Sequence, residues 1–298
     1  MGAAKDGITG KVIVALLAVY IVWGSTYLAI RISLEGFPPF LMAGIRFLCA
    51  GGILFLFLRG RGEQLPTIPQ VSGASLVGAF LLFGGNGGVV FAEQTVASGL
   101  AALAVATVPL WTVLFSGIWK RWPGHLEWAG LILGFAGIVL LNFEGEMKAS
   151  PSGAFALIIA AVSWALGSAW SGHLPLPKGL MASAVEMLTG GVLLIMAGAF
   201  TGERIQTLPS MRAASALIYL IIFGSLIGFS SYVYLLGRVR PVIATSYAYV
   251  NPVIAVMLGI WLAGERITGT GISAMLIILA GVVLGMLGQG RSKDAGKG

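Results

Sequence analysis

Apolar residues run along this chain in long blocks, and short polar segments separate one block from the next. A helix that crosses a membrane needs about 20 mostly apolar residues, and ten blocks of roughly that length account for nearly the whole sequence. A membrane β-barrel would instead alternate apolar and polar residues in segments of about ten, and these blocks do not alternate. The pattern predicts ten transmembrane helices at residues 11–31, 38–58, 74–95, 98–118, 126–143, 152–170, 180–200, 212–235, 241–262 and 270–288.

Composition favours the same class, an all-α membrane protein. Of the 298 residues, 57% are hydrophobic and only 10% are charged, whereas a soluble domain has about 25% charged residues. The chain therefore has too few charges to cover a water-facing surface of ordinary size. Cys49 is the only cysteine, which excludes an intrachain disulfide.

Lys and Arg are distributed unevenly between the two ends of these spans. Twelve fall on the N-terminal side, five fall on the other side, and Arg46 lies within a span. Because cytoplasmic loops carry the excess of Lys and Arg, we expect an inner (cytoplasmic) membrane protein with both termini in the cytoplasm. The net charge of +7 then reflects topology and attraction to anionic membrane lipid, and we expect no nucleic-acid partner.

The two halves of the chain resemble each other. LMAGIRFLCAGGIL at 41–54 aligns without gaps on LMASAVEMLTGGVL at 180–193, with six identities. Matches elsewhere keep nearly the same offset, and one of them places Trp23 on Trp164. A duplication explains this regularity better than chance similarity between apolar segments.

Each half contains five predicted spans, and an odd number of spans forces the second copy to insert upside down. The sequence therefore predicts two inverted five-helix repeats, residues 1–147 and 148–298, around a central cavity. Inverted repeats are typical of secondary transporters. This is the strongest functional inference that the residues allow.

Several motifs resemble one family. WGSTYLA at 23–29, the Arg46–Phe47 pair and WLAGERITGTGISAMLIILAGVVL at 261–284 are similar to motifs of the EamA-type drug/metabolite transporter superfamily, and within it the chain looks most like the YddG-type amino-acid exporters. The corresponding turn of the first half, WKRWPGHLEW at 119–128, lacks the Gly-Glu pair of that signature. The resemblance implies a basket of ten helices around a central cavity, with spans five and ten set to the side.

Two prolines occupy matching places in the two repeats. Pro109 and Pro252 each lie about eleven residues inside a span, which at 1.5 Å per residue is close to the middle of the membrane. Each proline removes a backbone hydrogen bond and bends its helix, and broken helices at matching positions of inverted repeats indicate a transport site. We expect both to act as hinges; the alternative is that they only shape helix packing.

Polar and aromatic residues gather near these prolines and at the middle of other spans. Apolar walls with a few hydrogen-bonding groups suit a small amphipathic solute, and aromatic rings can contact an ammonium group. The alternative is that Trp and Tyr form belts at the membrane interface. The predicted substrate-binding residues are Trp23, Asn86, Thr107, Trp111, Trp164, Ser230, Tyr232, Tyr247 and Asn251.

Arg46 and Glu186 are ionisable residues well inside spans two and seven. A charge at such depth is costly, and its default interpretation is a functional site. Glu186 is a candidate proton site because desolvation disfavours the charged carboxylate; the alternative is that it reaches the interface or bonds to backbone. The inverted repeat places the two residues at different depths, so we do not expect them to pair directly.

Glycines interrupt the apolar pattern in four places. LLFGGNGG at 81–88 lacks the Lys and Ser/Thr that follow the glycines of a phosphate-binding loop, and its counterpart FGSLIG at 223–228 has no asparagine. We therefore interpret the glycines as partly architectural, since they let neighbouring helices and a solute approach the backbone, and we expect Asn86 to face the substrate. GLILG at 130–134 and GVVLG at 281–285 are small-xxx-small motifs, which allow helices to pack closely, either within the protein or in a dimer.

Other classes fit the sequence less well. A membrane-embedded enzyme needs a nucleophile with a base or a metal cluster within the bilayer. The two histidines and two aspartates fall in predicted loops and tails, so we expect no catalytic residue, no metal site and no cofactor. A channel is harder to exclude, but inverted repeats with broken helices favour alternating access. The sequence thus predicts a transporter, active as a monomer, that exports amino acids with aromatic or neutral side chains, or alternatively other drugs or metabolites.

Overall fold

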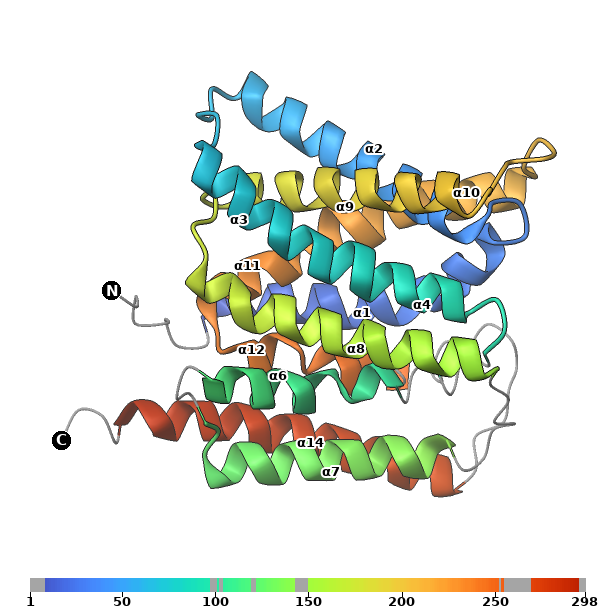
Figure 1. The fold of residues 1–298 in the computed structure, drawn as a ribbon. Coiled ribbons are helices and arrows are strands. Elements are labelled where there is room, and N and C mark those ends of the chain that lie inside the picture. The colour runs from blue at the N-terminus through green and yellow to red at the C-terminus, as the bar shows by residue number, and fades with distance from the viewer. Residues whose placement is uncertain are drawn as a thin grey trace.

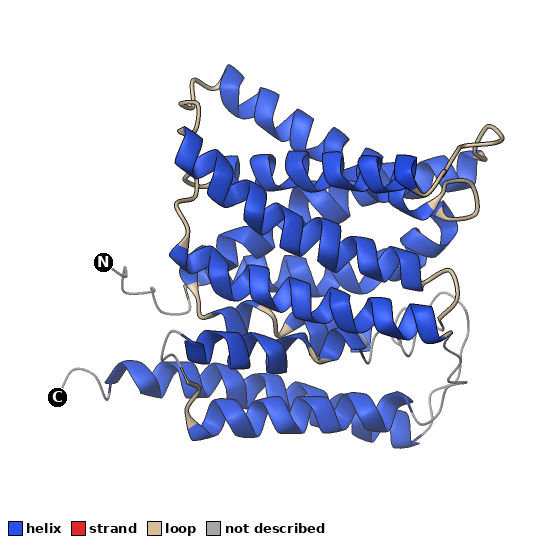
Figure 2. Ribbon diagram, in the orientation of Figure 1, coloured by secondary structure: helices blue, strands red, loops and turns tan. Residues whose placement is uncertain are grey.

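The structure is a computed structural model that describes residues 9–96, 101, 104–118, 122–142, 150–251, 253–254 and 269–294. The described part consists of helices and loops without strands (Figure 2), so the predicted all-α class is confirmed. The helices run roughly alongside one another, and the first described helix begins, and the last one ends, on the same side of the bundle (Figure 1). We call this side the terminal side and the other the opposite side.

The helical elements follow the predicted spans. Six stretches are long and apolar enough to cross a membrane, namely Gly10–Ser33, Pro39–Gly60, Ile68–Ala92, Pro151–His173, Leu180–Phe200 and Met211–Arg238. The elements are α1 (Gly10–Ser33), α2 (Pro39–Gly60), α3 (Ile68–Gly78), η1 (Ala79–Asn86), α4 (Gly87–Ala92), α6 (Val108–Ile118), α7 (His125–Asn142), α8 (Pro151–Trp170), η2 (Ser171–His173), α9 (Leu180–Phe200), α10 (Met211–Tyr219), η3 (Leu220–Phe229), α11 (Ser230–Arg238), α12 (Pro241–Ala244) and α14 (Gly269–Asp294).

Side-chain caps fix where several helices begin. Ser150 accepts a hydrogen bond from the N–H of Gly153 at the start of α8, and Ser210 does the same for α10. The start of α2 has no such cap from its own segment. Instead the carboxylate of Glu203, in the other repeat, accepts from the N–H groups of Phe40 at 3.2 Å and Leu41 at 2.8 Å. These contacts satisfy donors that a helix start leaves free.

The two repeats are interlocked. α2 packs on α9, its counterpart in the second half, and α7 packs on α14 in the same way. α1 packs against α10, η3 and α11, whereas its counterpart α8 packs against α3, η1 and α4. This reciprocal pairing is the arrangement that an inverted repeat produces. α7 and α14 lie together at one edge of the bundle (Figure 1), as the family resemblance implied.

The two small-xxx-small motifs meet each other inside this chain. A Cβ on Gly130 would lie 2.5 Å from the carbonyl oxygen of Gly281, and one on Gly281 would lie 2.6 Å from the backbone nitrogen of Gly134. Only glycine permits backbones to approach so closely. Of the two alternatives for these motifs, the structure shows packing within the protein.

Spans three and eight contain π-helical segments that the sequence analysis did not predict. η1 and η3 are π-helices; η1 contains LLFGG at 81–85, and η3 contains IIFGS at 221–225, which aligns with it in the second repeat. A π-helix widens the turn and is frequent at functional sites. Here glycines of the wide segments let tryptophans from the other repeat approach, since a Cβ on Gly85 would lie 2.6 Å from the ring of Trp164 and one on Gly228 would lie 2.5 Å from Trp23 Nε1.

Spans four and nine are interrupted within their described residues, each by one or two residues in turns. In span four the helix is broken at Thr107, two residues before Pro109. In span nine, turns at Thr245 and Ser246 separate α12 from the helix that continues at Tyr247. The hydroxyls of all three residues donate to backbone carbonyls three or four residues earlier, which satisfies carbonyls that a break would leave unpaired. Pro252 lies outside the described residues.

Candidate functional site

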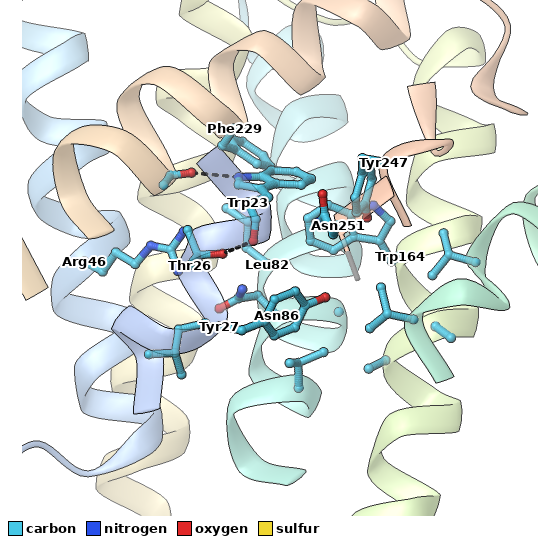
Figure 3. A pocket seen from close by; sticks show the side chains of 18 of the residues that line it. Trp23, Thr26, Tyr27, Arg46, Leu82, Asn86, Trp164, Phe229, Tyr247 and Asn251 are labelled. Atoms are coloured by element: carbon cyan, nitrogen blue, oxygen red, sulfur yellow. Dashed lines mark hydrogen bonds between the residues drawn. The ribbon is translucent and has the colours of Figure 1, made fainter. Parts of the chain in front are cut away.

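A cavity of about 70 Å³ lies between the two repeats, with walls from spans one, two, three, four, six, eight and nine. Six residues singled out from the sequence line it: Trp23, Arg46, Asn86, Trp164, Tyr247 and Asn251 (Figure 3). A water site needs roughly 10–15 Å³ by this measure, so this central pocket has room for several waters or part of a small solute. Its walls are mostly apolar, with a few polar groups.

Four aromatic side chains form the floor of the central pocket. The Trp23 ring centroid lies 4.7 Å from that of Tyr247 and 5.3 Å from that of Tyr232, and the Trp164 centroid lies 5.4 Å from that of Tyr232. Tyr232 is fully buried below the pocket; its hydroxyl accepts from Trp164 Nε1 at 3.0 Å and lies 2.5 Å from Ser168 Oγ. We call Trp23, Trp164, Tyr232 and Tyr247 the aromatic floor.

The aromatic floor is on the terminal side of the pocket. α1 runs away from the terminal side, and its lining residues are Trp23 and then Thr26, Tyr27 and Ile30. α8 runs the opposite way, and its lining ends at Trp164. The pocket therefore extends from the floor toward the opposite side, and the packed rings close it on the terminal side.

Three polar residues of the pocket differ in how they are satisfied. Asn251 is buried. Its side-chain amide is oriented so that the nitrogen, rather than the oxygen, faces two carbonyl oxygens. The nitrogen donates to the carbonyl oxygens of Tyr20 at 3.2 Å and Tyr247 at 3.1 Å. Asn86 has a buried side-chain oxygen without a hydrogen-bond partner. Arg46 donates from Nε to Ser225 Oγ at 2.7 Å, but its Nη1 has no partner. Unsatisfied buried groups are rare and point to a ligand or water.

Four of the predicted binding residues do not line this pocket: Tyr232, which lies below it, and Thr107, Trp111 and Ser230. Thr107 and Trp111 bond to each other, with Trp111 Nε1 donating to Thr107 Oγ1 at 3.2 Å. Ser230 is buried, and its hydroxyl has no partner. Pro109 is buried in α6 next to Val108, which does line the pocket. The roles of Thr107, Trp111 and Ser230 in binding substrate, and of Pro109 in bending its helix, therefore stay predictions.

Sequence reasoning missed several lining residues, among them Thr26, Tyr27, Gly224 and Phe229. Two of these, Thr26 and Tyr27, could have been predicted from helical spacing. Residues three and four apart lie on one face of an α-helix, so Trp23 predicts that Thr26 and Tyr27 share its face. Gly224 and Phe229 lie on the π-helical segment η3, where this spacing does not apply.

Glu186 lies in a different cavity from Arg46. It lines a space of about 510 Å³ on the terminal side, between η2, the start of α9 and the end of α11. Its carboxylate oxygens are buried and have no partner. Lys178 and Arg238 line the same space, and Arg238 also lies over the ring of Tyr234, 5.6 Å from its centroid. Arg46 and Glu186 thus line separate cavities, and the described structure records no ion pair between them.

A buried ion pair was also missed. Glu127 at the start of α7 is fully buried, and Arg240 Nη1 lies 2.6 Å and 2.5 Å from its two carboxylate oxygens. The same carboxylate accepts from the N–H of Gly124 at 2.8 Å. From the sequence, Arg240 counted only as one of the twelve Lys and Arg residues on the N-terminal side of the spans. The pair ties α7 to the start of α12, on the terminal side.

Comparison with known proteins agrees with this architecture. The "Uncharacterized inner membrane transporter YedA" of Escherichia coli is 48% identical over 276 residues, covering 92% of this chain and 90% of that protein. The "Probable amino-acid metabolite efflux pump" of Salmonella typhimurium is 26% identical and covers 95% of each chain.

The fold itself has a solved counterpart. One crystal structure superposes with a TM-score of 0.79 at 22% identity, covering 94% of this chain and 99% of that one, and so shares the two-repeat fold. The sequence pattern described as "EamA-like transporter family" matches residues 10–143 and again 151–287. The chain therefore belongs to the EamA-like transporter family, within the drug/metabolite transporter superfamily.

Proposed function

We propose that the protein is an inner-membrane secondary transporter that exports amino acids with aromatic or neutral side chains by alternating access. The observation that carries the proposal is the central pocket, where aromatic walls meet two polar side chains with unused hydrogen-bonding capacity, Arg46 and Asn86. Such a site suits a solute that is apolar at one end and polar at the other. The name of the Escherichia coli relative supports the inner membrane, and the name of the Salmonella typhimurium relative supports the export of amino-acid metabolites. Other drugs or metabolites are the alternative substrates.

The transport cycle follows from the position of the aromatic floor. In this conformation the floor separates the central pocket from the larger cavity that contains Glu186. Export requires a second conformation in which the floor opens toward the terminal side, which we take to be cytoplasmic from its excess of Lys and Arg. Pro109 and Pro252 are the proposed hinges, and one monomer contains both repeats and the whole pocket.

Proteoliposomes loaded with labelled amino acids test the function. We expect at least one neutral or aromatic amino acid to leave faster than from protein-free vesicles and to be recovered chemically unchanged, which also tests the non-enzymatic role. Unlabelled amino acid outside should accelerate exit, because alternating access exchanges solutes whereas a channel does not. If no amino acid in a broad panel leaves faster than the background, the proposed substrate class is wrong.

A matched pair of variants on α8 tests the pocket itself. Trp164→Ala removes a ring of the aromatic floor, whereas Phe155→Ala removes a ring that is 64% exposed on the bundle surface. We expect Trp164→Ala to slow exit by about tenfold or more, at about 1.4 kcal/mol per factor of ten, and Phe155→Ala to leave it unchanged. Replacing both hinge prolines with alanine should also slow exit, and normal flux in a folded double variant contradicts the hinge role.

A further inference from the structure

Arg46 places a guanidinium group inside the bundle. The residue lies on α2, is 3% exposed and lines the central pocket. Figure 3 shows its side chain extending toward Thr26 of α1 at one end of the pocket. Its Nε donates to Ser225 Oγ, which fixes the plane of the group, while Nη1 has no partner. Arg46 is therefore held in place but is incompletely satisfied.

Its positive charge is also uncompensated. Within the described structure no carboxylate lies in ion-pair range of Arg46. Glu186 lines the other cavity, and Glu203 is engaged by the N–H groups at the start of α2. The ring of Phe47, whose centroid lies 4.7 Å from the guanidinium carbon, offers only a weak attraction. A buried charge without a partner is costly, so the site favours an anion supplied by a ligand.

The space around the guanidinium is kept open by a glycine of the second repeat. A Cβ on Gly224 would lie 2.7 Å from Arg46 Nη2 and 3.1 Å from the methyl carbon of Thr26. The carbonyl oxygen of the same glycine accepts from Trp23 Nε1 at 3.0 Å. The π-helical segment η3 thus positions both the guanidinium of Arg46 and the ring of Trp23, so this end of the pocket has a defined geometry.

We infer that Arg46 binds the carboxylate of the transported solute. Guanidinium and carboxylate groups form strong, charge-assisted hydrogen bonds. Asn86 lines the same pocket, and its unpartnered oxygen can accept a hydrogen bond from the solute's ammonium group. The solute's side chain then packs against the rings of Trp23 and Tyr247. This inference rests on the proposed function and specifies its substrates: they must carry a carboxylate.

The test compares solutes that differ only in the polar ends. L-Phenylalanine, its primary amide, phenethylamine and 3-phenylpropionate are each examined for exit from proteoliposomes and for thermal stabilisation of the detergent-purified protein. We expect the two carboxylates to stabilise the wild-type protein and phenylalanine to be preferred over its amide by about 10- to 150-fold, the range of a hydrogen bond to a charged group. Arg46→Gln should abolish this preference. Arg212→Gln, which removes a charge from an exposed residue, should retain it.

The outcomes separate this inference from the proposed function. If phenylalanine and its amide bind and move equally well, the carboxylate role is overturned while amino-acid transport stands. If the carboxylates bind through Arg46 but no amino acid is transported, the role is supported and the proposed function fails. If no carboxylate stabilises the wild-type protein, the role is overturned. Should Arg46→Gln fail to fold, Arg46→Met retains a long side chain without the charge, and an undiminished preference for phenylalanine over its amide in that variant also overturns the carboxylate role.

Discussion

The indole rings of Trp23 and Trp164 meet edge to face, with their centroids 5.5 Å apart and their planes at 81°. Each tryptophan comes from the first helix of its own repeat, so the two copies of the duplicated unit touch at this point. Edge-to-face contact between aromatic rings is favourable beyond simple burial. The contact forms the centre of the aromatic floor, and the proposed opening of the floor would separate the two rings.

Tyr232→Phe should loosen the aromatic floor. The variant retains the ring but removes the hydroxyl that accepts from Trp164 Nε1 and contacts Ser168 Oγ. Leaving a buried polar group unpaired costs about 1–3 kcal/mol, so we expect a lower thermal unfolding temperature in detergent and greater opening toward the terminal side. The second effect is read from the labelling rate of a cysteine introduced at Ala161 in the central pocket, in a Cys49→Ala background, with a reagent that reaches only the terminal side of the vesicle-embedded protein.

Tyr234→Phe is the control for this variant, because the contact of Tyr234 with Arg238 is through the ring. Its unfolding temperature and labelling rate should match those of the parent. Equal behaviour of the two phenylalanine variants contradicts a role of the Tyr232 hydroxyl in holding the floor closed.

Gly281→Ala should destabilise the α7–α14 pair. Its Cβ would lie 2.6 Å from Gly134 N and 2.7 Å from the carbonyl oxygen of Gly130, so the helices must move apart, and overpacking typically costs about 1–3 kcal/mol. Gly285→Ala lies one helical turn away, and its Cβ meets nothing within 4 Å. That change should be neutral or stabilising by up to about 1 kcal/mol. Thermal unfolding in detergent distinguishes the two, and equal stability argues against close packing of these helices.

Arg240→Gln should destabilise the protein far more than Arg212→Gln. The first change leaves the fully buried carboxylate of Glu127 without its cation, a loss that commonly costs about 3–5 kcal/mol. The second breaks a pair between exposed side chains 3.7 Å apart, Arg212 and Glu35, and exposed pairs contribute about 0–1 kcal/mol. Unfolding in detergent at increasing salt adds a check, because salt screens exposed pairs more than buried ones. Similar losses for both variants contradict the buried pair.

Glu186→Gln tests the proposed proton site. If protons enter as the solute leaves, an acidic exterior should accelerate exit from wild-type vesicles, because protonation of Glu186 becomes part of the cycle. The variant cannot exchange a proton and should lose the response. Lys178, Arg238 and Tyr234 line the same cavity, so Lys178→Gln is included to show whether the response belongs to the carboxylate. A wild-type flux that ignores the gradient removes the proton site from the mechanism.

The sequence predicted much of the fold because the signals for it are local. Apolar blocks mark the spans, and the repeat follows from an alignment that keeps a steady offset. The glycine motifs of spans five and ten predicted close packing because small residues have few other uses in such helices. The break in span four was expected from Pro109, although its place at Thr107 depends on hydroxyl–carbonyl bonds that composition does not indicate.

The pocket was only partly predictable, for a physical reason. A helix in this bundle is apolar on the face toward lipid and on the face toward its neighbours, so hydrophobic periodicity does not identify the inner face. Thr107 and Trp111 therefore seemed equivalent to Asn86, although they bond to each other beside the pocket. The π-helical turns shift the register of spans three and eight, and the Glu127–Arg240 pair joins residues that are distant in sequence. Such features depend on tertiary packing.

The interlocked halves have a consequence for how a binding site can arise in this fold. Two identical five-helix units, associated with opposite orientations, would present every polar group of the cavity twice. In the duplicated chain the alignment sets Arg46 against Val185, and Asn86 against Leu226. The shared cavity thus receives one guanidinium and one unpaired amide oxygen rather than two of each, and two like charges do not repel each other across it. The different residues of the two copies thus make the two ends of the cavity chemically unlike, and under the proposed function a solute with different ends would lie in it in one direction only.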